Sequence, residues 1–140
     1  MSELAPSTRL GADRVGFVAE SPPSRARVFS ETLASLAHFE GVRGGLIVAP
    51  DGLVIASTLP GRSAGEALAA VGASLGRELE RGADRLGRGE FRMAVFAGAE
   101  GLILLGASLI GFLMLIGDRN IDVAAVRTAL GRALPQLHGD

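Results

Sequence analysis

Hydrophobic positions recur with two different spacings along the chain, and these spacings predict alternating helices and strands. Between residues 25 and 40 the spacing is helical. The apolar and half-polar side chains that fall near one face of this helix are Val28, Phe29, Thr32, Leu33, Leu36 and Phe39. Gly41 follows the last of them, and a glycine just past a helix readily takes the left-handed conformation that ends it. We therefore expect a first helix over about 25–40.

The next segment has the pattern of a β-hairpin. Two apolar, β-branched runs flank Pro50, Asp51 and Gly52. Proline presets φ for the first turn position, and glycine accepts the positive φ of a later one. This combination predicts strands over about 43–49 and 53–58.

After a loop at 59–63, a long helix is expected over about 64–87, with three kinds of side chain around it. On a helical wheel the larger apolar residues form one stripe, which we predict to face the core. Its members are Leu68, Val71, Leu75, Leu79 and Leu86. A neighbouring stripe of small residues consists of Gly65, Ala69, Gly72, Gly76 and Ala83. The opposite side is charged and carries Arg77, Glu78, Arg81, Asp84 and Arg85.

The small stripe requires an explanation, because each interior glycine costs a helix roughly 1 kcal/mol relative to alanine. A compositional drift toward glycine is one explanation. The other is that the stripe lets a second backbone approach closely, most simply the same helix of a second subunit. We predict this second arrangement. The charged row of Arg77, Glu78, Arg81 and Arg85 has the composition of an ordinary solvent-exposed helix face. If this helix binds a partner protein, the row is the first candidate for the contact.

The segment from Gly101 to Gly117 is uncharged over 17 residues, which raises the question of a membrane span. A spanning helix needs about 20 apolar residues, with basic and aromatic flanks that are incomplete here. A division at residues 107–109 instead gives two runs of ordinary strand length. With a preceding strand at 91–97 and a turn at 98–101, we predict a three-stranded meander. A membrane-associated segment and a buried helix are the alternatives.

A final helix is expected over about 121–134, limited by Pro135. Asn120 is the expected N-cap, and Asp122 favours the positive end of the helix dipole. Its apolar face consists of Val123, Val126, Leu130, Leu134 and Leu137. The element order α-β-β-α-β-β-β-α predicts an α+β domain, a five-stranded antiparallel sheet with helices packed on it. The single domain spans 24–137; residues 1–23 form a tail in which only 14–18 has strand character.

Composition removes several classes of site. The chain has no cysteine, so it has neither disulfides nor a thiolate metal site. All 14 of its basic residues other than histidine are arginine, which excludes a Schiff-base or Walker-type lysine. The net charge is −1, without the basic footprint of a nucleic-acid-binding protein. The N-terminus has no secretory pattern, so we expect a cytoplasmic protein.

Catalytic patterns are weak in this sequence. Residues 72–76 match G-x-S-x-G, with Asp118 or Asp122 and then His138 in the chain order of an α/β-hydrolase triad. However, Ser74 lies inside the helical pattern, without the strand and sharp turn that the motif requires. The two histidines, His38 and His138, are far apart in sequence, so we predict no metal, no cofactor and no catalytic site. Arg62 and Arg88 are the loop candidates for an arginine finger, and a solvated surface role is their default.

Three segments together resemble the roadblock (dynein light chain-like) domain family, including its bacterial MglB-like members. They are the hairpin G-V-R-G-G-L-I-V-A-P-D-G-L-V-I-A-S at 41–57, F-R-M-A-V-F-A at 91–97 and G-L-I-L-L at 101–105. The resemblance covers about 40–135 and implies a profilin- and longin-like fold. It also implies a homodimer that pairs its long helices and joins its third strands edge to edge, which places Met93 and Val95 in the dimer interface.

The same resemblance implies a function. Family members are partners and regulators of Ras-like small GTPases or adaptors in larger assemblies, and MglB-like members activate a GTPase. We therefore expect a dimeric regulator or scaffold of a Ras-like GTPase that has no catalytic site of its own. Activation would follow from ordering the GTPase's switch loops, without a residue donated in trans. The alternative is an adaptor that dimerises and tethers other proteins without affecting nucleotide turnover.

Overall fold

The helices and strands follow one another in the predicted order. The computed structural model describes residues 24–139 and ends in a short 3₁₀ helix, η2. The elements are α1 (Arg25–Ala37), β2 (Val42–Val48), β3 (Val54–Ser57), α2 (Arg62–Arg85), β4 (Met93–Ala97), β5 (Leu102–Ser108), β6 (Gly111–Gly117), α3 (Val123–Ala133) and η2 (Leu134–Gln136). The predicted tail at 1–23, with its strand-like segment at 14–18, lies outside the described residues.

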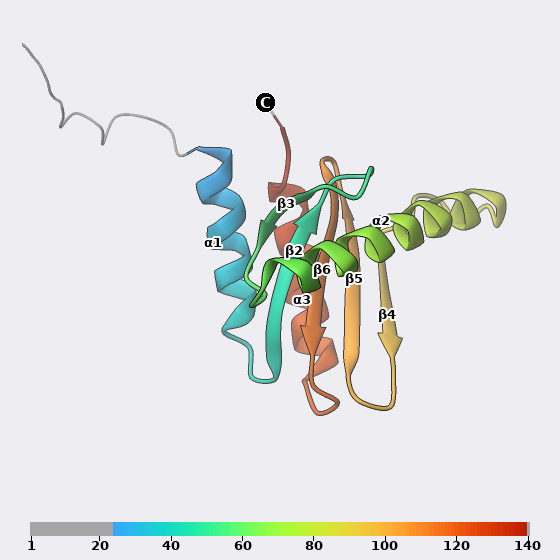
Figure 1. Ribbon diagram of the computed structural model, residues 1–140. Coiled ribbons are helices and arrows are strands. Elements are labelled where there is room, and N and C mark those ends of the chain that lie inside the picture. The colour runs from blue at the N-terminus through green and yellow to red at the C-terminus, as the bar shows by residue number, and fades with distance from the viewer. Residues whose placement is uncertain (1–23, 140) are drawn as a thin grey trace, which may run out of the picture.

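The five strands form one antiparallel sheet in the order β3-β2-β6-β5-β4 (Figure 1). β2–β3, β4–β5 and β5–β6 are hairpins between neighbouring strands. The connection from β3 to β4 runs from one edge of the sheet to the other, and α2 makes this crossing. The α+β class with a five-stranded antiparallel sheet is therefore confirmed.

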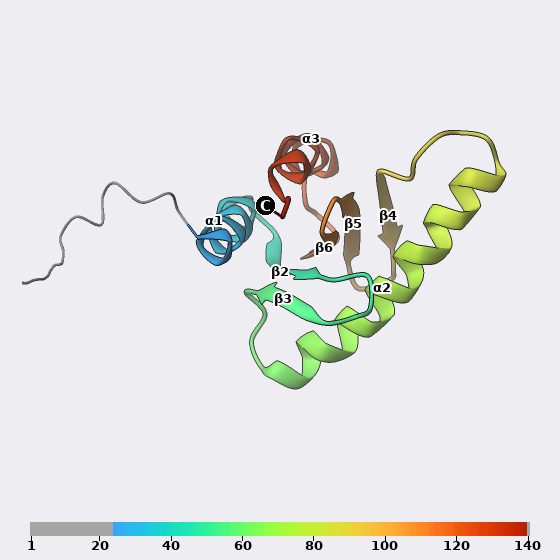
Figure 2. The same cartoon turned by 90° about the horizontal axis from the view of Figure 1, so that it is seen from above.

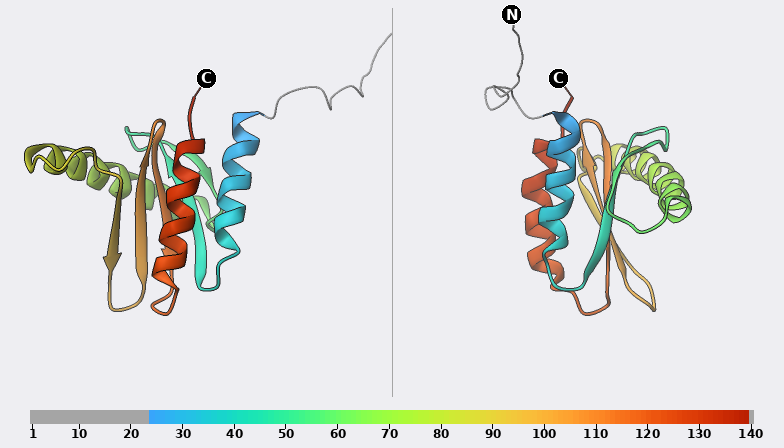
Figure 3. Two further views of the ribbon diagram at one scale, coloured as in Figure 1. Left: turned by 180° about the vertical axis from the view of Figure 1, so that it is seen from behind. Right: turned by 60° about the vertical axis from the view of Figure 1, so that its left-hand side comes forward.

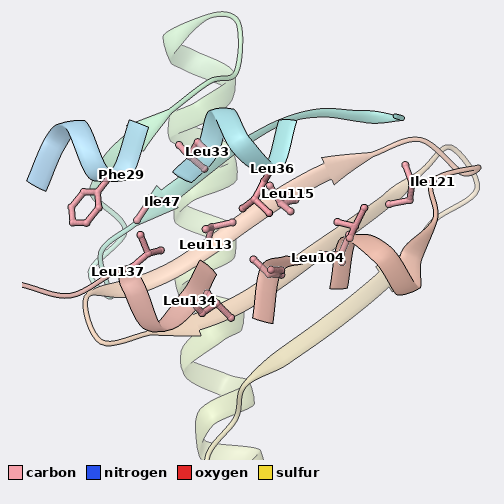
Figure 4. Close-up of a cluster of buried hydrophobic side chains, with 12 residues drawn as sticks. Phe29, Leu33, Leu36, Ile47, Leu104, Leu113, Leu115, Ile121, Leu134 and Leu137 are labelled. Atoms are coloured by element: carbon pink, nitrogen blue, oxygen red, sulfur yellow. The ribbon is translucent and has the colours of Figure 1, made fainter. Parts of the chain in front are cut away.

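The helices cover both faces of the sheet. α1 and α3 lie side by side on one face and α2 crosses the other (Figures 2 and 3). The core under α1 and α3 includes Phe29, Leu33, Leu113 and Leu134 (Figure 4). The core under α2 includes Leu46, Leu105, Phe112 and Met114. Because the central strands are buried on both faces, their sequences are apolar on both sides.

The uncharged segment 101–117 forms β5 and β6, which confirms the prediction of two strands. Leu104, Leu105, Phe112, Leu113 and Leu115 on these strands are at most 1% exposed. In residues 24–139 we find no helix whose length and apolar character would suffice to cross a membrane. The apolar run therefore supplies the middle of the sheet.

Two turn glycines adopt the conformations that the sequence predicted. Gly41 has φ +90° between α1 and β2, and Gly52 has φ +96° in the β2–β3 turn. Side chains other than glycine rarely adopt these angles. In the same turn the Leu53 amide donates a hydrogen bond to Asp51 Oδ1 at 3.1 Å. The predicted hairpin at Pro50-Asp51-Gly52 is confirmed.

The start of α3 differs from the prediction, because Asn120 is not the N-cap. α3 begins at Val123, and the Asp122 side chain accepts a hydrogen bond from the Ala125 amide at 3.1 Å. The cause is Ile121, which is buried against the two glycines Gly41 and Gly117. A turn in which the Ile121 amide donates to the Asp118 carbonyl holds this side chain in the core. The helix can begin only after that turn.

This corrected cap gives a matched pair of substitutions. Asp122→Ala removes the side chain that caps the Ala125 amide, so we expect a loss of about 1 kcal/mol in the free energy of unfolding. Asn120→Ala should change it by only a few tenths of that. Urea denaturation of both variants measures the difference. Equal losses would show that Asp122 does not cap α3.

Candidate interaction surface

The buried side of α2 is made of small residues. Gly65, Ala69, Gly72, Ala73 and Gly76 are its buried positions. A Cβ atom added at Gly72 would lie 2.1 Å from Sδ of Met114, and one added at Gly76 would lie 2.6 Å from Cε1 of Phe112. The large side chains at this contact therefore come from β6, and the helix offers the space for them.

This arrangement corrects the predicted dimer interface. Gly65, Ala69, Gly72 and Gly76 lie against the chain's own sheet, so they present no surface to a second chain. Ala83, also assigned to the small stripe, is half-buried. The small residues of α2 do allow another element to approach the helix closely, as predicted, but that element is β6 of the same chain. The sequence signal for this contact was the pair Phe112 and Met114, which alternate on one face of a strand.

The predicted core stripe of α2 is also displaced. Leu68, Leu75 and Leu79 are half-buried and pack at the margin of the core, whereas Val71 is exposed and Leu86 is 76% exposed. Because the small residues take the central position under the helix, these larger side chains fall on its flank. We call Leu68, Leu75, Leu79 and Leu86 the leucine flank. It leaves an apolar surface along one side of α2.

The second half of α2 extends past β4, beyond the edge of the sheet (Figures 1 and 2). It carries the charged row. Arg77 donates a hydrogen bond to the Pro50 carbonyl of the β2–β3 turn. Arg81 and Glu78 form an exposed ion pair of 3.2 Å, and Arg85 is exposed. The row therefore lies on the outer surface, with Arg77 fixed to the hairpin.

The outer surface of the first half of α2 is different, because it carries no charge along its centre. The exposed positions along this centre are small or apolar, Ala64, Ala67, Ala70, Val71 and Ser74, whereas the exposed Arg62 and Glu66 lie to one side of it. We call the five small or apolar residues the outer face. A helix surface without long side chains lets another protein approach its backbone closely, and exposed apolar area of this kind is typical of interaction sites.

β4 is an open edge of the sheet, since within residues 24–139 it pairs only with β5. Val95 is 37% exposed, and Met93 is half-buried against the core beneath α3. The opposite edge, β3, has four residues and a register irregularity where it pairs with β2. Short or irregular edge strands pair poorly with strands of other chains, whereas a regular edge strand with free backbone groups can pair with them. β4 is therefore the edge better suited to an additional strand.

A cleft of about 980 Å³ opens beside the start of β4. One wall is the charged side of α2, with Arg77, Arg81 and Asp84. The remaining walls come from the start of β4, the β5–β6 turn and the end of α3. Leu109 in that turn is 86% exposed. The cleft therefore lies between the charged side of α2 and the segments at the start of β4.

The residues of the hydrolase pattern are not assembled. Ser74 lies within α2, whereas His138 follows η2, and these elements lie on opposite faces of the sheet (Figure 2). Asp118 forms an ion pair of 2.8 Å with Arg43, and the hydrogen bond and negative charge of Asp118 raise the pKa of Arg43. Asp122 caps α3. Among residues 24–139 no three histidine, aspartate or glutamate residues could hold a metal ion together. Arg62 and Arg88 are exposed.

One family model matches most of the described chain. Residues 28–117 match the model of the Roadblock/LC7 domain. The uncharacterized protein MJ0310 of the archaeon Methanocaldococcus jannaschii is 29% identical over 110 residues, which are 79% of this chain and 96% of that protein. A second protein of the same organism, MJ0714, is 27% identical over 79% of this chain and 93% of its own length.

Solved structures show the same fold. The gliding protein MglB of Thermus thermophilus superimposes with a TM-score of 0.72 and 20% identity, covering 84% of this chain and 90% of that one. An MglB with a tetrameric arrangement gives 0.73 and 21% over 84% and 90%. A Roadblock/LC7 domain from Streptomyces avermitilis gives 0.66 and 19% over 76% and 88%.

Proposed function

Because this chain belongs to the Roadblock/LC7 domain family, we propose that it acts as a homodimer that binds and regulates a Ras-like small GTPase. The observation that carries this proposal is a set of uncovered surfaces on the described chain. It combines the edge of β4, the leucine flank and the outer face of α2. The first two suit a second copy of the chain, and the third suits another protein.

The dimer would pair the two β4 strands and bring the two α2 helices together. Antiparallel pairing of β4 with its copy satisfies the backbone groups of both edges. It also places both α2 helices on the same face of one continuous sheet. The exposed Leu86 and the half-buried Leu75 and Leu79 then lie on the side of each helix that meets the other. MglB proteins, whose fold this chain shares, include one with a tetrameric arrangement.

The GTPase would bind across the outer faces of the two α2 helices. The five small or apolar residues of each outer face let a partner approach closely, and the Glu78–Arg81 pair beside them offers polar contacts at the margin. Regulation would follow from tighter binding to one conformation of the GTPase's switch loops than to the other. No side chain of this protein is required in the GTPase's active site. Arg62→Ala and Arg88→Ala should therefore leave the activation unchanged.

The direct test is GTP hydrolysis by a Ras-like GTPase from the same organism, measured with and without this protein. We expect the single-turnover rate to rise with the concentration of the dimer and to saturate. Binding that leaves the rate unchanged would replace the regulator by an adaptor. A lack of binding to every Ras-like GTPase of the organism, in both nucleotide states, would overturn the proposal.

A substitution on the outer face tests where the GTPase binds. Ala67→Glu places a long charged side chain at an exposed position, so we expect at least a tenfold weaker affinity for the GTPase with an unchanged dimer. Ala34→Glu is the matched control, because Ala34 is an exposed alanine on α1, across the sheet. Titration calorimetry measures both. Equal affinities of the two variants would place the binding site away from α2.

A further inference from the structure

The hydrogen bonds of β4 define which of its backbone groups are free. The Ala107 amide donates to the Arg92 carbonyl at 2.9 Å, and the Gly98 amide donates to the Gly101 carbonyl at 2.8 Å. In an antiparallel ladder the residues bonded to one neighbour alternate with those facing the other side. Residues 92, 94, 96 and 98 therefore bond to β5. The amides and carbonyls of Met93, Val95 and Ala97 point to the open edge.

These three residues determine the best register for a second copy. Two identical antiparallel strands related by a two-fold axis place one residue opposite itself. If that residue is Val95, Met93 of each chain faces Ala97 of the other, and all three open residues form hydrogen-bonded pairs. A shift of the axis to residue 94 or 96 leaves one open residue of each strand opposite a position outside the strand Met93–Ala97. The register centred on Val95 thus satisfies the most backbone groups.

The same register has a consequence for the cleft. The start of β4, at Phe91, Arg92 and Met93, lines the cleft, and the turn at 98–101 lies at the other end of the strand. A two-fold axis beside Val95 brings the start of one strand next to the end of the other. The turn of one copy then lies next to the start of its partner's β4, which lines the partner's cleft. This turn is the small sequence Gly-Ala-Glu-Gly, and Arg119 donates to its Ala99 carbonyl at 3.3 Å.

We propose that the cleft is a composite site, completed in the homodimer when the β4–β5 turn of a second copy closes it, with Val95 on the two-fold axis. This inference rests on the dimer proposed above. The occupant is a second copy, since the free edge that borders the cleft matches its own sequence in antiparallel register.

The absence of cysteine from the sequence makes the register directly measurable. In Val95→Cys the two thiols lie on the axis, and hydrogen-bonded antiparallel pairs have Cα atoms about 5.5 Å apart, within disulfide range. We expect this variant to form a disulfide-linked dimer under mild oxidation. Ala94→Cys and Phe96→Cys should not, because in this register each lies diagonally from its own copy, beyond about 7 Å.

The position of the turn is tested by the double variant Arg92→Cys, Ala99→Cys with a short bismaleimide. Both residues are exposed, and seven residues of extended chain separate them by roughly 23 Å within one protomer. A product that joins the two positions is therefore intermolecular. We expect such a dimer from the double variant, and at most a trace from either single variant. Peptide mapping should find position 92 joined to position 99.

The outcomes separate this inference from the dimer itself. A stable dimer in light scattering that is cross-linked through position 94 or 96, or not joined between 92 and 99, would overturn the composite cleft and retain the homodimer. A monomer at high micromolar concentration, without cross-links, would overturn both. Cross-linking at Val95 and between 92 and 99 in the same dimer supports the proposal.

Discussion

Replacing Gly76 with leucine should destabilise the folded chain by about 3 kcal/mol, the upper end of the range for overpacked cores. The cause is the Phe112 ring. A Cβ at position 76 would lie 2.6–2.7 Å from three of its ring carbons, and Phe112 is 1% exposed. Because the ring is buried in the core, we expect α2 to shift away from the sheet to make room for the added side chain. Urea denaturation followed by circular dichroism measures the loss.

A matched pair of alanine substitutions isolates this contact from helix propensity. Gly76→Ala and Gly82→Ala gain the same roughly 1 kcal/mol of propensity within one helix. A Cβ at Gly82 meets no atom within 4 Å, whereas one at Gly76 meets the ring. We expect Gly82→Ala to stabilise the protein and Gly76→Ala to destabilise it. Equal stabilisation of both variants would show that the Phe112 ring does not pack against Gly76.

Met114 should be more tolerant than Phe112. The contact at Gly72 is with Sδ of a flexible methionine side chain, which can rotate away. Gly72→Ala should therefore cost less than Gly76→Ala. In addition, Phe112→Leu should recover part of the loss caused by Gly76→Ala, a coupling that a double-mutant cycle measures.

The second large effect is expected at the dimer. Leu86→Glu should weaken self-association at least 100-fold, about 2.8 kcal/mol. Leu86 is 76% exposed in the single chain, so the change costs the fold little. In the proposed dimer the two α2 helices would bury this position, and a carboxylate there loses its hydration without gaining a partner. Sedimentation equilibrium over a range of concentrations measures the dissociation constant.

Leu53→Glu is the control for this experiment. Leu53 is 68% exposed, but it lies in the β2–β3 hairpin, away from β4 and the leucine flank. Its substitution adds the same charge and should leave the dissociation constant within about twofold. If Leu86→Glu and Leu53→Glu associate equally, the leucine flank does not form the interface. An unchanged stability of the Leu86→Glu monomer excludes unfolding as the cause.

The sequence by itself determined the order of the elements and the fold class. Local chemistry was sufficient there, because Pro50 and Gly52 specify a turn and the two halves of 101–117 have strand length. It also indicated that α2 closely approaches another element, since its glycines are unfavourable in an isolated helix. It misplaced the start of α3, where the burial of Ile121 outweighs the capping preference of Asn120.

Only the tertiary structure decided which side of α2 faces inward. Helical periodicity locates two adjacent stripes but does not say which one the sheet accepts. That choice depends on the side chains across the interface, and Phe112 and Met114 occupy the space that larger residues on the helix would need. Since a close-packed layer has a fixed thickness, large residues on the strand require small ones on the helix. The leucines were thereby placed on the flank, where a second chain can reach them.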